Sequence, residues 1–263
     1  MSETNLLTVD TLEVVYHRAV TAIQGVSLKV ARGQIVAVLG TNGAGKSTTL
    51  RAISGFLGID DARVTDGAVT FDGKRIDNRP PNEITRLGIA LVPERDKVFP
   101  NLTVAENLAA PFATGGPGED AIYGIFPRLA DLRGRTAGLL SGGERQMLAI
   151  ASALMCGPQL LLVDELSLGL APVAVEDLMQ RLLQIRNDLG VTILIVEQSA
   201  AAALQIAEYG YVLENGRVVL DGDAERLRNH DDIREFYLGQ SVNRERRNYR
   251  DVKQYRRSRR WYG

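Results

Sequence analysis

The chain has 263 residues, of which 45% are hydrophobic and 24% charged, and its formal net charge is −1. This is enough for one large α/β domain, or for one domain with a subdomain. No apolar stretch approaches the roughly 18–20 residues of a membrane span, and the first ten residues do not resemble a secretory signal. A lone cysteine, Cys156, excludes an internal disulfide. We expect it to be a small buried hydrophobic residue in a reducing compartment, and we expect the protein to be cytosolic.

Strand patterns dominate the first part of the chain. Residues 6–16 and 25–34 alternate in part, and residues 67–76 resemble a hairpin around Asp72-Gly73. An apolar run at 34–40 closes on glycine, residues 46–58 have helical spacing, and a further strand is expected at 88–93.

Helices and strands alternate in the second part. Thr103 and Glu106 are spaced as a capping box that opens a helix within 101–110. The apolar run 160–163 predicts a buried parallel strand, followed by a helix at 173–190 and a strand at 191–197. Short strands at 209–216 and 217–222 close the body. This order predicts a mostly parallel, doubly wound sheet with a small antiparallel layer beside it and a helical insertion over about 95–155.

A phosphate-binding loop is the clearest motif. The segment "GTNGAGKST" fits G-x-x-x-x-G-K-[ST] and lies between a predicted strand and a predicted helix, as the motif requires. Its glycines let backbone N–H groups turn toward phosphate oxygens, and the helix N-terminus favours negative charge. We expect Lys46 to reach the β and γ phosphates and the Ser47 hydroxyl to bind Mg²⁺. The residues expected to hold the nucleotide are Gly40, Thr41, Asn42, Gly43, Ala44, Gly45, Lys46, Ser47 and Thr48.

Two adjacent carboxylates, Asp164 and Glu165, follow the buried run 160–163. Paired negative charges at the tip of a buried strand are costly unless something compensates them. In a doubly wound sheet ligands bind beyond the carboxyl ends of the strands, so Asp164 is expected to face the magnesium held by Ser47. Glu165 is then placed to polarise the water that attacks the γ-phosphate. The alternative is a strand end that merely caps the next helix.

The segment "LLSGGERQMLAI" at 139–150 separates this chain from other phosphate-loop proteins. Ser141 and Glu144 form a second capping box, and Gly142 and Gly143 leave a helix N-terminus able to hold an anion. With the two preceding motifs, this segment makes the sequence resemble the ATP-binding-cassette (ABC) ATPases.

The resemblance covers about residues 6–239 and carries its own expectations. It implies a P-loop NTPase (RecA-like) core with a small antiparallel β subdomain and a helical signature subdomain. It further implies that Ser141, Gly142 and Gly143 contact ATP bound to a second cassette, and that Tyr16 stacks on adenine. Tyr16 is also compatible with an ordinary hydrophobic strand position. We therefore assign 1–240 to one ATPase domain, with the helical subdomain at about 95–155.

Two positions depart from the general ABC pattern. Glu94 stands where a glutamine near the metal is usual, and Gln198 replaces the histidine after the last core strand. With "VPERDKVF", "VEQSA" and "YVLENG", this pairing resembles the F-type ATPase subunit of branched-chain amino acid (Liv) importers and close relatives for urea or amides. Even there the acid is usually followed by proline, whereas this chain has Leu166, for which we expect little effect on the chemistry. Gln198 can hydrogen-bond a phosphate or water but carries no charge, so we expect Glu165 to be the principal catalytic group.

The segment from Ser241 onward is strongly basic. It holds nine Arg and Lys residues against two acids, a net charge of +7 that leaves −8 on residues 1–240. We treat 241–263 as an extension beyond the ATPase domain. Its composition is compatible with a solvated, disordered tail, with attraction to anionic lipid or a partner subunit, and with nucleic-acid binding. A cassette docked under a membrane favours lipid or a partner subunit over nucleic acid.

The resemblance implies an ATP- and Mg²⁺-dependent motor subunit of an importer, peripheral at the cytoplasmic face of the cell membrane. Its implied partners are a second ABC ATPase, as a G-type heterodimer or a homodimer, two membrane permeases and an extracytoplasmic solute-binding protein. Two other hypotheses remain: a homodimeric cassette of another system such as lipid export, and a nucleotide-binding regulator or scaffold with little hydrolysis. Glu94 and Gln198 argue against the first, and Lys46, Asp164 and Glu165 argue against the second.

Overall fold

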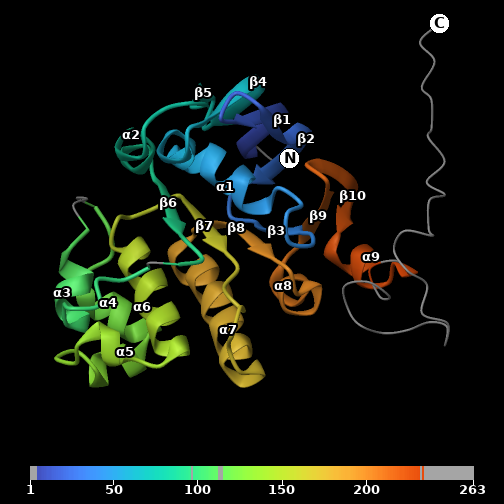
Figure 1. The fold of residues 1–263 in the computed structure, drawn as a ribbon. Coiled ribbons are helices and arrows are strands. Elements are labelled where there is room, and N and C mark those ends of the chain that lie inside the picture. The colour runs from blue at the N-terminus through green and yellow to red at the C-terminus, as the bar shows by residue number, and fades with distance from the viewer. Residues whose placement is uncertain (1–4, 96, 112–114, 232, 234–263) are drawn as a thin grey trace, which may run out of the picture.

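The computed structural model describes residues 5–95, 97–111, 115–231 and 233. Figure 1 shows an antiparallel sheet and α1 above a second, mostly parallel sheet, with α3 to α6 grouped below and to one side. The basic extension 241–263 lies outside the described residues. The strands are β1 (Asn5–Tyr16), β2 (Val20–Ala31), β3 (Ile35–Leu39), β4 (Ala62–Phe71), β5 (Lys74–Arg75), β6 (Ile89–Val92), β7 (Leu160–Asp164), β8 (Thr192–Glu197), β9 (Tyr209–Glu214) and β10 (Arg217–Asp223).

The helices pack on both faces of the second sheet. They are α1 (Lys46–Ser54), α2 (Pro81–Arg86), α3 (Val104–Ala109), α4 (Glu119–Ile125), α5 (Pro127–Asp131), α6 (Gly142–Leu154), α7 (Pro172–Leu189), α8 (Ala200–Ile206) and α9 (Ala224–Arg228), with short 3₁₀ helices at Phe56–Asp60 and Ala137–Leu139. No described helix combines the length and the apolar character needed to cross a bilayer.

The second sheet has the strand order β10-β9-β3-β8-β7-β6, and its strands are parallel except for the β9–β10 hairpin. The first sheet is antiparallel, with the order β2-β1-β4-β5. The predicted doubly wound core with a small antiparallel layer is therefore confirmed. The predicted hairpin at residues 67–76 is also present, because Asp72 and Gly73 both adopt the positive φ of a tight hairpin turn (46° and 75°).

The central strands are apolar throughout because both of their faces are covered. In β7, Leu161 and Val163 join the core formed with the helices α3 to α8. Leu160 and Leu162 point the other way, into the core shared with α1 and the antiparallel sheet. Successive side chains of a strand alternate between its faces, so an uninterrupted apolar run is what a strand between two layers requires.

The helix after the phosphate-binding loop is shorter than its apolar spacing predicts. It ends at Ser54, because Gly55 adopts a left-handed conformation (φ 81°) and its N–H bonds the carbonyl of Arg51. A Cβ at Gly55 would lie 2.4 Å from the backbone oxygen of Arg79, so the chain turns there into a 3₁₀ segment. Both predicted capping boxes are confirmed, at Thr103 with Glu106 and at Ser141 with Glu144.

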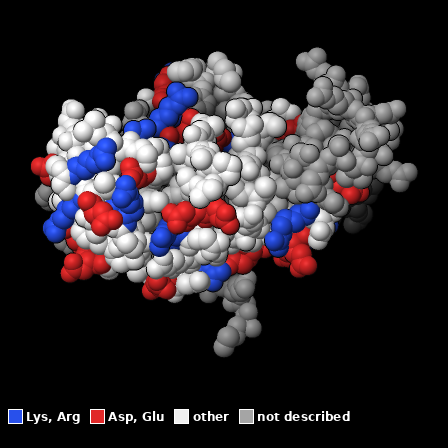
Figure 2. All heavy atoms as spheres, turned by 90° about the horizontal axis from the view of Figure 1, so that it is seen from below, with Lys and Arg blue, Asp and Glu red and all other residues white. Residues whose placement is uncertain are grey.

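The charged surface is mixed rather than sorted by sign on the face seen from below. Figure 2 shows basic and acidic side chains interspersed there among the described residues. The negative formal charge of the body therefore does not gather into a single acidic patch on this face, and we assign that face no long-range attraction for a charged partner.

Truncating the middle of β7 should destabilise the whole protein. Leu162 is fully buried, so Leu162→Ala removes apolar contacts and leaves a cavity that should cost about 2–5 kcal/mol. Urea unfolding followed by circular dichroism measures this loss. Ile59→Ala, at a side chain that is 72% exposed, is the control and should change stability by less than about 0.5 kcal/mol. Equal losses in the two variants would contradict the two-layer core.

Candidate functional site

The loop between β3 and α1 turns tightly against two neighbouring segments. Gly45 has φ 104°, a conformation that side-chain-bearing residues rarely adopt, and it immediately precedes α1. A Cβ at Gly40 would lie 2.6 Å from the backbone oxygen of Leu213 in β9. Ala44 is buried and its carbonyl accepts a hydrogen bond from the N–H of Gly216 (2.9 Å). The loop is thus fixed from outside, and Gly40 and Gly45 occur where a side chain would clash with or strain the backbone.

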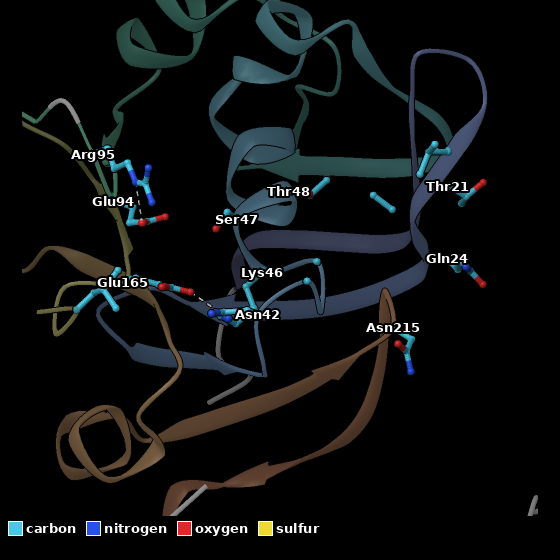
Figure 3. Close-up of a pocket in the computed structure, with 15 residues that line it drawn as sticks. Thr21, Gln24, Asn42, Lys46, Ser47, Thr48, Glu94, Arg95, Glu165 and Asn215 are labelled. Atoms are coloured by element: carbon cyan, nitrogen blue, oxygen red, sulfur yellow. Dashed lines mark hydrogen bonds and ion pairs between the residues drawn. The ribbon is translucent and has the colours of Figure 1, made fainter. Parts of the chain in front are cut away.

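The loop forms one wall of a cavity of about 770 Å³, within the range of small-molecule sites. The other walls come from the start of β2, the segment after β6, the segment after β7 and the β9–β10 turn. Figure 3 shows Lys46 and Ser47 at the start of α1 directed toward Glu165 and Glu94 on the opposite wall, with Thr21 and Asn215 at the far end. Five segments distant in sequence therefore meet around one hollow.

Lys46 and Glu165 form a buried ion pair across this cavity. The Nζ of Lys46 lies 3.1 Å from Oε1 of Glu165 and donates to the carbonyl of Thr41 at 3.2 Å. Both residues are less than 9% exposed. The pair neutralises two charges that would be costly to bury alone. Lys46 and Glu165, expected to serve different parts of the reaction, are direct partners here.

Asp164 accepts a hydrogen bond from the hydroxyl of Ser47 at 3.0 Å. Burial raises the pKa of Asp164 to about 6, with repulsion from Glu165 and Glu94 in the same direction, while the Ser47 hydrogen bond and Lys46 oppose the rise. The predicted contact between the end of β7 and the start of α1 is therefore present.

The oxygen donors of this corner fit a magnesium ion. Mg²⁺ favours hard oxygen ligands, usually one or two carboxylates with water and phosphate oxygens. Within the described residues no three His, Cys, Asp or Glu side chains form a metal-binding group. The Ser47 hydroxyl and the Asp164 carboxylate, already 3.0 Å apart, match the sparse protein ligand set that this ion takes beside a phosphate.

Glu94 and Gln198, the two departures from the general pattern, line two different cavities that both include Glu165. Glu94 lines the main cavity and pairs with Arg95, its Oε1 lying 3.1 Å from Nε. Gln198 is exposed just after β8 and lines a smaller neighbouring cavity with Thr41 and Glu165. Glu165 therefore borders both hollows, and the loop carrying Gln198 adjoins it.

Tyr16 lies beside the cavity rather than in its wall. Its hydroxyl is 3.3 Å from Oγ1 of Thr48, and its half-buried ring packs against the core beneath the antiparallel sheet. Val20 and Thr21 line the cavity nearby. Stacking of Tyr16 on a base stays a prediction.

The signature segment is separate from the main cavity. Ser141 caps α6 by accepting from the N–H of Glu144 (3.3 Å), and Gly142 lines an adjacent cavity with Lys97 and Arg145. None of Ser141, Gly142 and Gly143 lines the hollow that contains Lys46. Within this one chain the signature segment therefore does not reach the phosphate-binding loop.

Leu166, at the position where the resemblance leads us to expect proline, is fully buried in the helical core. Its carbonyl accepts from Nε2 of Gln146 in α6 at 3.0 Å. Packing and this hydrogen bond fix the backbone after Glu165, where a proline ring would otherwise restrict it.

Three residues of this region were not predicted from the sequence. Arg95 lines the main cavity beside Glu94. Lys97 lines the adjacent cavity, and burial lowers its pKa to about 8 while Glu94 and Asp164 oppose the drop. Glu197 is 1% exposed at the tip of β8. Glu197 could have been found, because an acid that ends a buried apolar run is the signal that identified Asp164.

Comparisons with known proteins agree with this geometry. The ABC transporter family model matches residues 23–167. The chain is 42% identical over 229 residues to the high-affinity branched-chain amino acid transport ATP-binding protein BraG of Pseudomonas aeruginosa, covering 85% of this chain and 96% of that protein. It is also 42% identical over 219 residues to the probable branched-chain amino acid transport ATP-binding protein LivF of Archaeoglobus fulgidus, covering 81% and 91%. A crystal structure of the ADP conformation of an ATP-binding cassette of an ABC transporter matches with a TM-score of 0.75 and 27% identity, over 90% of this chain and 99% of that one.

Neutralising Asp164 should stabilise the magnesium-free protein at neutral pH. Because the pKa of Asp164 is about 6 when folded and lower when unfolded, folding loses stability as the pH rises from about 4 to 6. Asp164→Asn keeps an acceptor for Ser47 and abolishes this loss. Its free energy of unfolding should therefore exceed that of the wild type by roughly 2–3 kcal/mol above pH 6.5. Urea unfolding in EDTA at pH 4.5 and 7.5 measures the difference, and an advantage that did not change with pH would contradict the burial argument.

Proposed function

Since this chain belongs to the ABC transporter family and is an ATP-binding, ATP-hydrolysing cassette, we propose that it energises import of branched-chain or other hydrophobic amino acids through separate permease subunits. The observation that carries the proposal is the 42% identity to BraG and LivF over more than nine-tenths of each. A second support is that the departures Glu94 and Gln198 are those of the F-type branch. We place the subunit at the cytoplasmic face of the cell membrane.

Residues of the main cavity would hold the nucleotide. The backbone N–H groups of the loop and the start of α1 would bind the phosphates, with Lys46 at the β and γ positions. Ser47 and Asp164, with Glu94 nearby, would hold Mg²⁺, whose chemistry is to neutralise charge that develops on the phosphate oxygens. Tyr16 and the wall at Thr21 would lie toward the base.

The Lys46–Glu165 ion pair implies an exchange of partners on ATP binding. In the described structure the two side chains neutralise each other at 3.1 Å. When Lys46 turns to a γ-phosphate, the Glu165 carboxylate is released to accept a hydrogen bond from the attacking water. Glu165 can then orient that water and take up its proton. Gln198, next to Glu165, would donate a hydrogen bond to the phosphate without adding charge, so we expect slow turnover in the isolated subunit.

A second cassette would complete the site. Ser141 is exposed and Gly142 and Gly143 are half-buried at a helix start outside the chain's own cavity, as a segment that serves a neighbouring ATP would be. The segment 167–172 after Glu165 would join the two cassettes. We expect a G-type ATPase as the partner, two permeases and an extracytoplasmic solute-binding protein. Closure of the two cassettes over ATP would then switch the permeases, and hydrolysis would reopen them.

Replacing Glu165 by Gln should abolish turnover while ATP still binds. The amide keeps an acceptor for Lys46 but cannot take a proton, so kcat should fall by about 100-fold or more. Phosphate release measures turnover, and a fluorescent ATP analogue measures binding. Glu225→Gln, which removes an exposed charge from α9, is the matched control and should be fully active. Undiminished hydrolysis in Glu165→Gln would remove Glu165 from its catalytic role.

The tagged chain should co-purify from gently solubilised membranes with two membrane-spanning subunits and a second ABC ATPase. Mass spectrometry identifies the partners, and cells carrying the untagged chain are the control. Uptake of labelled leucine, isoleucine and valine by the same cells, with urea as competitor, then tests the solute. Recovery of the chain alone or with nucleic acid would contradict the importer assignment.

A further inference from the structure

A buried carboxylate at the tip of β8 has no part in the mechanism above. Glu197 is 1% exposed and immediately precedes Gln198. Both of its oxygens accept hydrogen bonds from one residue: Oε1 from the backbone N–H of Ser167 at 2.9 Å, and Oε2 from the Ser167 hydroxyl at 2.6 Å. Ser167 lies two residues beyond Glu165. Glu197 therefore clasps the segment that carries the proposed catalytic base, Glu165.

Burial disfavours the charged form of the Glu197 carboxylate. It raises the pKa of Glu197, while the two hydrogen bonds from Ser167 oppose the rise. A buried carboxylate is tolerated where strong hydrogen bonds satisfy it, and such charge-assisted bonds fix geometry more tightly than neutral ones. The position is thus suited to holding Ser167 in one place.

The two residues before Ser167 are held as well. The N–H of Glu165 donates to the carbonyl of Val196 at 2.9 Å, and the carbonyl of Leu166 accepts from Gln146 at 3.0 Å. Residues 165, 166 and 167 are therefore tied in turn to β8, to α6 and again to β8.

This bracing has a reason in the backbone of Glu165. Its φ is +44°, a left-handed conformation that costs a non-glycine residue about 1 kcal/mol or more and persists only where the surroundings impose it. The β8 pairing holds the backbone before Glu165, and Glu197 supplies two bonds on the other side. Without the two hydrogen bonds between Ser167 and Glu197, the backbone after Glu165 can relax. The Glu165 carboxylate can then turn away from the attacking water.

We propose that Glu197 is a positioning residue for ATP hydrolysis: through Ser167 it fixes the strained conformation of Glu165 and couples the 167–170 segment to the strand that presents Gln198. The inference rests on the catalytic role proposed above for Glu165. Glu197, the glutamate of "VEQ", is not among the proposed nucleotide-binding residues, and this inference gives it a role.

The experiment compares four variants of the full chain, purified with whatever subunits accompany it. Glu197→Ala removes both bonds and should lower kcat by on the order of 10- to 100-fold, with KM for ATP changed less than about threefold. Ser167→Ala removes only the hydroxyl bond and should lower kcat by about threefold. Glu197→Gln keeps an acceptor for the N–H and gains a donor for the hydroxyl oxygen, so kcat should recover to within about threefold of wild type.

Thr192→Val is the matched control. Thr192 is fully buried at the other end of β8, and its hydroxyl accepts from the N–H of Gly33 at 2.9 Å. The valine variant loses one buried hydrogen bond of the same strand, so its unfolding midpoint should fall while kcat stays unchanged. Amide hydrogen exchange over 165–169 adds a measurement that needs no turnover, and it should speed up in Glu197→Ala but not in Thr192→Val.

The outcomes separate this inference from the proposed function. Unchanged kcat in Glu197→Ala beside an inactive Glu165→Gln overturns the positioning role only. A kcat loss in Thr192→Val as large as in Glu197→Ala, or no rescue by Glu197→Gln, also overturns it, because a general loss of stability or of charge would then explain the effect. Hydrolysis that persists in Glu165→Gln overturns the role of Glu165 and this inference with it.

Discussion

The parallel pairing of β3, β8 and β7 is the constraint on which the site depends. Leu39 at the end of β3 lies opposite Glu197, and Asp164 at the end of β7 lies opposite Val196. This register ends three strands at one edge of the sheet, and the chain leaving each strand carries functional groups. The phosphate-binding loop therefore meets the Asp164-Glu165 pair, although more than a hundred residues separate them in the chain. Gln198, which follows β8, lies at the same edge. A slip of β8 by one residue would turn Glu197 to the other face and break the clasp on Ser167.

The second organising feature is an excess of carboxylates over cations in a small buried space. Asp164, Glu165 and Glu197 are each less than 9% exposed, and among the described residues Lys46 forms an ion pair with one of them, Glu165. The raised pKa values of Asp164 and Glu197 reflect the cost of keeping such charges out of water. In the proposed function a magnesium ion would offset part of this negative charge, and hydrogen bonds from Ser47 and Ser167 already orient Asp164 and Glu197.

The proposed mechanism combines a catalytic base held in a fixed position with a signature segment that would arrive from a second cassette. The N–H of Glu165 bonds β8, and the next two residues are bonded to α6 and to Glu197, so the backbone around Glu165 is fixed by the core. The signature segment at the start of α6 lies outside the cavity. In the proposed assembly it would contact ATP bound to a neighbouring cassette. The Gln146–Leu166 hydrogen bond links the two, because one helix both presents the signature and holds the backbone next to Glu165. Displacement of α6 would therefore shift the backbone next to the proposed catalytic base.

The sequence by itself determined the layers, the phosphate-binding loop and the carboxylates at the end of β7, because these depend on local patterns: apolar runs, glycines at fixed spacing and capping boxes. It also identified the family. It did not reveal that Lys46 pairs with Glu165, that Leu166 is fully buried, or that Glu197 clasps Ser167. Those contacts join residues 30 to about 120 positions apart. Only the strand order and register bring them together, and neither property is encoded in any short stretch of the chain.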